Sequence, residues 1–163
     1  MNSTVMANKA IQKLAIALGA AGENLVQKAL MEDGWKVTRS DNVFDSTKDM
    51  VAVKDGKDIL VEVKTQVPWV TQNAVTVKPD QIKKCLNVDC LVFVTIPPTG
   101  RTNYIYGGWM LKVDPKKMQY KLVEAKGGRM MAVIPIDQPA VELWKKIPTR
   151  DLADIKHLTV STY

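Results

Sequence analysis

Two acidic residues are spaced so that a β-hairpin would bring them together. The runs 49–54 and 57–64 are rich in strand-forming residues, and the Asp55-Gly56 pair between them is typical of a two-residue type I′ turn. In the register that this turn sets, Asp49 lies directly opposite Glu62, with the two Cβ atoms roughly 5 Å apart. The sequence therefore predicts two neighbouring carboxylates at one end of a hairpin.

A lysine and a glutamine follow on the same strand. Side chains alternate along a strand, so Lys64 and Gln66 project from the same face as Glu62. Two carboxylates at that spacing can hold Mg²⁺, which takes oxygen ligands and retains several waters, and a nearby ammonium can orient a water or neutralise developing charge. This chemistry is metal-assisted hydrolysis of a phosphodiester. An acid and a base two residues apart are also common at exposed strand ends, where they form an ordinary surface ion pair.

The order of these residues resembles the PD-(D/E)XK nuclease superfamily, in which a helix with an acid precedes a strand with Asp and a strand with Glu-x-Lys. Residues 19–37 are similar to the opening helix of that family, with Glu23 at the position of the acid. Gln66 matches the glutamine often found two positions after the lysine. Lys48 departs from the proline in the family name, at a position that varies. The resemblance covers about residues 19–96.

The resemblance implies an α/β fold with a mixed central β-sheet flanked by helices, as in the restriction-endonuclease-like core. It implies that Glu23, Asp49 and Glu62 are Mg²⁺ ligands, that Lys64 orients the attacking water, and that Gln66 is a supporting polar group in the catalytic site. Mn²⁺ is expected to substitute for Mg²⁺. The implied function is a Mg²⁺-dependent DNA endonuclease.

A second function class stays open, namely a nucleic-acid-binding module that keeps this fold without cutting. The set of three carboxylates favours catalysis, because a module that only binds has no need of acids where a phosphate approaches. Among nucleases, a Holliday-junction resolvase, a homing or restriction endonuclease and a repair nuclease would share these residues. Cutting both strands calls for two active sites, so we expect a homodimer or a higher homo-oligomer.

The composition agrees with a basic, globular protein. The chain has 163 residues, a formal net charge of +6 and 46% hydrophobic residues, which suits one domain. The resemblance implies a single nuclease domain over residues 1–163, with a core at about 19–96 and an extension at about 103–163. No apolar run reaches the roughly 18 residues of a membrane span, and we expect a cytoplasmic protein with DNA as its partner. A single histidine, His157, leaves little basis for zinc chemistry.

Helical and alternating patterns predict the other elements. Apolar spacing favours an amphipathic helix over residues 8–18, which ends at the Gly-Ala-Ala-Gly sequence 19–22 and could cover the core or pair with another copy. Further predictions are strands over 35–39, 90–96 and 103–109, a helix that begins at Pro79, an irregular stretch after Gln66, and short helical or turn segments over 141–147 and 152–158. The strand 90–96 is the most hydrophobic and should be central.

Several basic or aromatic residues are candidates for DNA contact. Lys78, Lys83 and Lys84 follow the predicted site and could approach phosphates, although a solvated helix face would look the same. Arg101 could enter a groove of the DNA or keep its loop soluble. Trp69 could stack on a base, but core packing is the more common use of a tryptophan beside proline.

Overall fold

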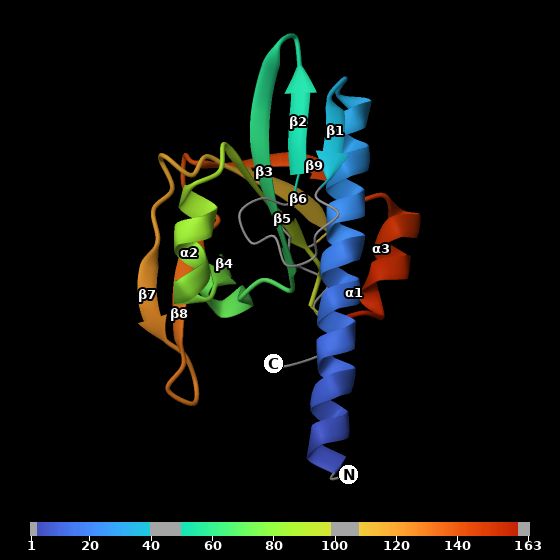
Figure 1. Cartoon of the computed structure of the whole chain (residues 1–163). Coiled ribbons are helices and arrows are strands. Elements are labelled where there is room, and N and C mark those ends of the chain that lie inside the picture. Colours follow the sequence, from blue (N-terminus) through green and yellow to red (C-terminus); the bar gives the residue numbers. More distant parts are fainter. Residues whose placement is uncertain (1–2, 40–49, 99–107, 160–163) are drawn as a thin grey trace.

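The computed structural model describes residues 3–39, 50–98 and 108–159. At its centre is a six-stranded sheet with the strand order β1-β2-β3-β5-β6-β9. Helices α1 and α3 lie on one side of this sheet, and α2 lies on the other side with a three-stranded sheet of order β4-β8-β7 (Figure 1). The elements are α1 (Ser3–Glu32), β1 (Lys36–Arg39), β2 (Met50–Lys54), β3 (Lys57–Gln66), η1 (Val70–Gln72), β4 (Ala74–Val77), α2 (Pro79–Leu86), β5 (Cys90–Thr95), β6 (Trp109–Val113), β7 (Lys121–Glu124), β8 (Met130–Pro135), β9 (Val141–Lys146) and α3 (Thr149–Lys156).

The central sheet is mixed. Strands β3 and β5 run parallel, and the crossover between them contains α2, whereas the other neighbouring pairs of this sheet are antiparallel. The predicted class, α/β with a mixed central sheet flanked by helices, is therefore confirmed. The finer likeness to a restriction-endonuclease-like core stays a prediction.

The hairpin of β2 and β3 has the predicted turn. Asp55 and Gly56 have φ values of 50° and 75°, and positive φ at both central residues defines a type I′ turn. Lys54 pairs with Lys57, and Met50 pairs with Val61. The predicted register is thus confirmed for the described pairs. Asp49 immediately precedes β2 and lies outside the described residues, so its position opposite Glu62 stays a prediction.

Strand β5 is central, as its hydrophobicity predicts. It lies between β3 and β6, and Leu91 to Ile96 are buried. Its alternating side chains divide between two cores. Val92 and Val94 pack with α1, while Leu91 and Phe93 pack with β4, α2 and β8. Both faces of the strand are covered, which explains why its sequence is almost continuously apolar.

Helix α1 runs without interruption through the Gly-Ala-Ala-Gly sequence, so the predicted break there is wrong. Gly22 is needed for packing, because a Cβ at this position would lie 1.7 Å from the Thr65 Oγ1 atom of β3. A Cβ at Gly19 would meet nothing within 4 Å. Gly22 therefore marks a close approach of α1 to β3, and the alanines Ala20 and Ala21 favour a continuous helix.

Several strands were not expected, among them β7 at Lys121–Glu124. Residues 141–147 were predicted as a helical or turn segment, but Val141–Lys146 is strand β9, and residues 74–77 form the short strand β4 within the predicted irregular stretch. The predicted helix at Pro79 is confirmed as α2, and much of the segment 152–158, predicted as helical or turn, lies in α3. Of the predicted strand 103–109, only Trp109, the first residue of β6, lies on a described strand. None of the described helices is long and apolar enough to cross a membrane.

Candidate active site

The candidate site begins where the β2–β3 hairpin leads into the centre of the sheet. The last described pair of this hairpin is Met50 with Val61, and from Glu62 to Gln66 strand β3 pairs in parallel with β5. Val61 and Val63 point into the core with α1. Alternation therefore places Glu62, Lys64 and Gln66 on the opposite face, where α2 and β4 lie.

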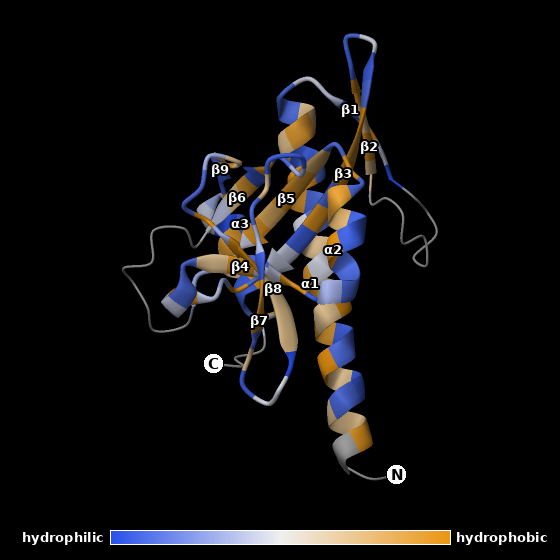
Figure 2. Ribbon diagram, turned by 90° about the vertical axis from the view of Figure 1, so that its left-hand side faces the viewer, coloured by the Kyte–Doolittle hydropathy of each residue, from blue (hydrophilic) through white to orange (hydrophobic). Residues whose placement is uncertain are grey.

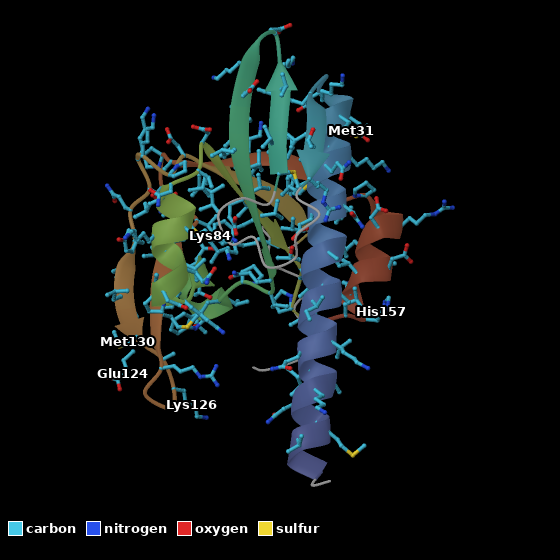
Figure 3. The ribbon with its side chains drawn as sticks, in the orientation of Figure 1. Met31, Lys84, Glu124, Lys126, Met130 and His157 are labelled. Atoms are coloured by element: carbon cyan, nitrogen blue, oxygen red, sulfur yellow. The ribbon has the colours of Figure 1, made fainter. Side chains whose placement is uncertain are left out.

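Glu62 is a buried carboxylate between two ammonium groups. Its side chain is 1% exposed, and its Oε1 atom lies 3.1 Å from Lys84 Nζ and 3.3 Å from Lys64 Nζ. A buried charge is costly unless it is paired, and two cations on one oxygen supply that pairing. Lys84 extends from α2 toward the sheet (Figure 3). The site therefore holds a negative charge that attracts cations from two elements.

Lys64 links this pair to an open pocket. Its Nζ atom donates a hydrogen bond of 3.2 Å to Gln81 Oε1 on α2. A pocket of about 390 Å³ adjoins it, lined also by Thr76, Lys78 and Asp80. Lys64 keeps 22% of its side chain exposed while it contacts Glu62. It is thus the member of the pair that meets the solvent-filled pocket.

Gln66 ties the two sheets together. Its Nε2 atom donates to the Thr76 carbonyl oxygen at 2.7 Å, and its Oε1 atom accepts from the Thr76 backbone N–H at 2.8 Å. Both ends of the amide are therefore bonded to the backbone of β4. In the structure, Gln66 positions β4 beside β3, and the catalytic supporting role expected for it stays a prediction.

Glu23 lies on the other side of the sheet from Glu62. Its carboxylate forms an ion pair with Arg39 Nη2, and Arg39 Nη1 donates to Asn24 Oδ1 on the same helix. Arg39 pairs with Met50, a residue of the α1 core, so its side chain projects on the α1 side. The structure therefore groups Glu62 with Lys64 on one face of the sheet, whereas Glu23 pairs with Arg39 on the opposite face. Its role as a metal ligand stays a prediction.

The predicted DNA-contacting residues have different environments. Lys78, immediately before α2, and Lys83, on α2, are exposed. Lys84 is 18% exposed and faces Glu62. Trp69 is half-buried in the turn that its N–H closes with the Ala74 carbonyl at 2.8 Å. Arg101 lies outside the described residues.

Sequence reasoning missed the contribution of α2 to the site. Gln81 and Lys84 are three residues apart, so they share the face of α2 that contacts Lys64 and Glu62. That spacing was the available signal, but the crossover that brings α2 onto β3 cannot be read from local pattern.

Across the ranges 3–39, 50–98 and 108–159, no three acidic, histidine or cysteine side chains are grouped closely enough to hold a metal ion, and Asp49 falls outside these ranges.

Neither a protein-family model nor any curated protein matches this chain.

Proposed function

We propose that this protein is a Mg²⁺-dependent DNA endonuclease that hydrolyses phosphodiester bonds. The observation that carries the proposal is the buried Glu62 carboxylate, which lies 3.3 Å from Lys64 on the same face of β3. Burying a carboxylate is costly unless it is paired, and here its paired lysine borders an open pocket. The adjoining pocket gives Lys64 access to a substrate.

The donor chemistry at this site fits Mg²⁺. Glu62 offers a hard oxygen ligand of the kind that Mg²⁺ takes, and the ion would have to displace Lys84, whose Nζ atom lies 3.1 Å from Oε1. The sequence resemblance suggests Asp49 and Glu23 as further ligands, and Glu23 would first have to leave its ion pair with Arg39 on the α1 side of the sheet. When bound, the ion would polarise a phosphoryl oxygen and acidify a water. Mn²⁺ accepts the same oxygen ligands and is expected to substitute.

Lys64 is the proposed catalytic cation. Its ammonium is fixed by Glu62 on one side and by Gln81 on the other, at 3.3 and 3.2 Å. A fixed donor needs no reorganisation when charge develops on phosphorus oxygens, so it can orient the attacking water or stabilise that charge. Gln81 acts as a positioning residue for Lys64.

DNA phosphates would approach from the pocket. Lys78 lines this pocket together with Lys64, and Lys83 is exposed on α2. These cations can neutralise phosphates beside the scissile bond, and the formal net charge of +6 favours a polyanionic partner. The substrate subclass, whether junction, restriction-type or homing site, depends on loops and assembly.

One observation supports the alternative of a module that binds nucleic acid without cutting it. Lys84 Nζ lies closer to Glu62 Oε1 than Lys64 does, at 3.1 Å, and so places a built-in cation on the candidate metal ligand. If Lys84 never leaves, no metal can replace it. Titration of Mn²⁺ into the wild-type protein, followed by water-proton relaxation, separates the two proposals, because the non-cutting module would bind no Mn²⁺ at Glu62.

The experiment that tests the proposed function is a cleavage panel. Supercoiled plasmid, linear duplex, single strand, four-way junction and flap are each incubated with the protein and Mg²⁺, Mn²⁺ or EDTA. The proposal expects metal-dependent cutting of at least one duplex-containing substrate. Binding to these DNAs with no cutting under any metal would favour the non-catalytic module instead.

A further inference from the structure

The first half of α1 extends away from the rest of the described protein. Residues 3–17, here called the arm, project beyond the sheets and the other helices (Figures 1 and 2). The arm exposes large apolar side chains on more than one face: Ile11 is 50% exposed, and Met6 and Ile16, on other faces of the helix, are 60% and 73% exposed. Isolated helices shorter than about 12–15 residues are marginal in water, so a projecting helix with exposed apolar residues calls for a packing partner.

A single apolar stripe joins the arm to the body of the protein. Its residues alternate in spacings of four and three, which is the pattern of a coiled-coil seam. The stripe consists of Ala7, Ile11, Leu14, Leu18, Ala21 and Leu25. Its last three members pack against the core beneath α1. The same helix face is therefore a packing surface at its C-terminal end and continues onto the arm.

The stripe leads into a groove between α1 and α3. This groove has a volume of about 350 Å³ and an apolar floor that includes Ala21, Leu25, Ile155 and Leu158. Two acidic residues of α3, Asp151 and Asp154, also line it, and α1 contributes Asn24 and the cation Lys28. The groove thus combines an apolar floor with negative charge at one side, and it lies on the helix face that carries the stripe.

We propose that the groove binds the arm of a second copy of this chain, in a two-fold dimer with the two α1 helices antiparallel. The charged side chains of residues 3–17 are Lys9 and Lys13, which complement Asp151 and Asp154. Parallel helices would instead bring these lysines close to their own counterparts. The inference does not depend on the proposed nuclease function.

The helix dimensions allow this arrangement. Antiparallel α-helices of equal rise bring residue 11 of one chain level with residue 21 of its partner when the two-fold axis crosses near Ile16. Leu14 and Leu18 of the stripe lie nearest the axis, and Ala15 and Ala17 flank them on either side. Small residues let helices approach closely, and each arm then covers the groove of the other chain. Such an isologous contact closes at two copies.

The first test is the association state measured by sedimentation equilibrium. The wild-type protein is expected to be a dimer at micromolar concentration. Ile11→Glu places a charge in the seam and should raise the dissociation constant on the order of a hundredfold. The matched control is Ile16→Glu, on another face of the arm, which should leave association nearly unchanged. A wild-type monomer at these concentrations, or an equal effect of both substitutions, would overturn the proposal.

The second test reads the orientation of the helices. Under mild oxidation, a mixture of the Ile11→Cys and Ala21→Cys proteins should form a cross-linked dimer, whereas Ile11→Cys alone should not. Native thiols interfere little, since Cys85 is buried and burial raises the pKa of the Cys90 thiol. Cross-linking of Ile11→Cys with itself would show parallel helices and contradict the antiparallel dimer.

A charge exchange tests the groove itself. Asp151→Lys with Asp154→Lys should weaken the dimer, and adding Lys9→Glu with Lys13→Glu to the same chain should restore it. If the dimer weakened by Asp151→Lys with Asp154→Lys were not restored by adding Lys9→Glu with Lys13→Glu, the arm would lie elsewhere and the proposed contact would be overturned. Light scattering at constant ionic strength measures both steps.

Discussion

At the residue scale, the chemistry of the site depends on which element holds each charged side chain. Glu62 forms ion pairs with Lys64 of its own strand and with Lys84 of α2, the helix of the crossover. The first pair is local in sequence, and the second depends on how α2 packs on β3. The sequence predicted that Glu62, Lys64 and Gln66 share a face, because alternation along a strand is a local property. It could not predict that Lys84 faces inward.

Loss of the Lys64 charge should slow cleavage without weakening DNA binding. Lys64→Met keeps the packing of the side-chain stem and deletes the ammonium, so we expect a single-turnover rate about a hundredfold lower at saturating DNA. The slope of the logarithm of DNA affinity against the logarithm of salt concentration should change by only about one unit, the equivalent of one phosphate contact. The control is Lys126→Met, in the turn between β7 and β8 (Figure 3). Weaker binding with a normal saturated rate would make Lys64 an anchoring residue.

Substitution of the two glycines of α1 should change stability in opposite directions. Gly22→Ala would place a Cβ 1.7 Å from Thr65 Oγ1, so the helix or the Thr65 side chain must shift, at a cost of about 1–3 kcal/mol. Gly19→Ala meets nothing within 4 Å and should stabilise the helix by about 0.5–1 kcal/mol. Urea unfolding measures both. Equal effects would show that α1 does not approach β3 as described.

At the scale of elements, patterns that are local in sequence were predicted and patterns set by packing were not. The hairpin turn follows from Asp55-Gly56, and the start of α2 follows from Pro79. Strand β9 was missed because the register between β6 and β9 shifts at Met110/Leu111, opposite Leu143 and Lys145. This irregularity leaves Val141 and Trp144, three residues apart, both half-buried, which imitates a helical period.

The contact between β9 and the end of α1 should make stability pH-dependent. Lys145 Nζ donates to Asp33 Oδ1 at 2.7 Å and Trp144 Nε1 donates to Oδ2 at 3.1 Å. The hydrogen bond from Lys145, more than that from Trp144, lowers the pKa of the Asp33 carboxyl below its ordinary value of 3.8. The stabilisation is therefore complete above pH 3.8 and is lost as the pH falls through the lower folded-state pKa.

Unfolding in urea at about pH 5.5 and at about pH 3 tests this contact. The wild-type protein should lose more stability on acidification than Asp33→Asn, which cannot titrate at this position. Asp58→Asn, at an exposed position of β3, is the matched control. An identical acid loss in the wild-type protein and in Asp33→Asn would show that the contact with β9 does not hold Asp33 in its charged form.

At the scale of the whole molecule, Gln66 joins the two sheets and so places α2 and its cations over the site. Gln66→Leu would leave the Thr76 N–H and carbonyl without this partner, and we expect a loss of about 1–3 kcal/mol. Hydrogen exchange should increase in β4 and β8, which pair with each other. Gln72→Leu, at an exposed position of η1, is the control. Unchanged exchange in β4 would show that the amide does not hold the sheets together.

Cleavage by the wild-type protein and two glutamate variants tests the central claim most directly. Single-turnover cutting is measured at saturating DNA, with Mg²⁺ or EDTA, for the wild type, Glu62→Gln and Glu124→Gln, the last at an exposed position of β7 (Figure 3). Circular dichroism confirms that each variant is folded. The account predicts Mg²⁺-dependent cutting in the wild type and in Glu124→Gln, and a rate lower by about a hundredfold or more in Glu62→Gln. Cutting by folded Glu62→Gln at the wild-type rate, or wild-type cutting that persists in EDTA, would contradict it.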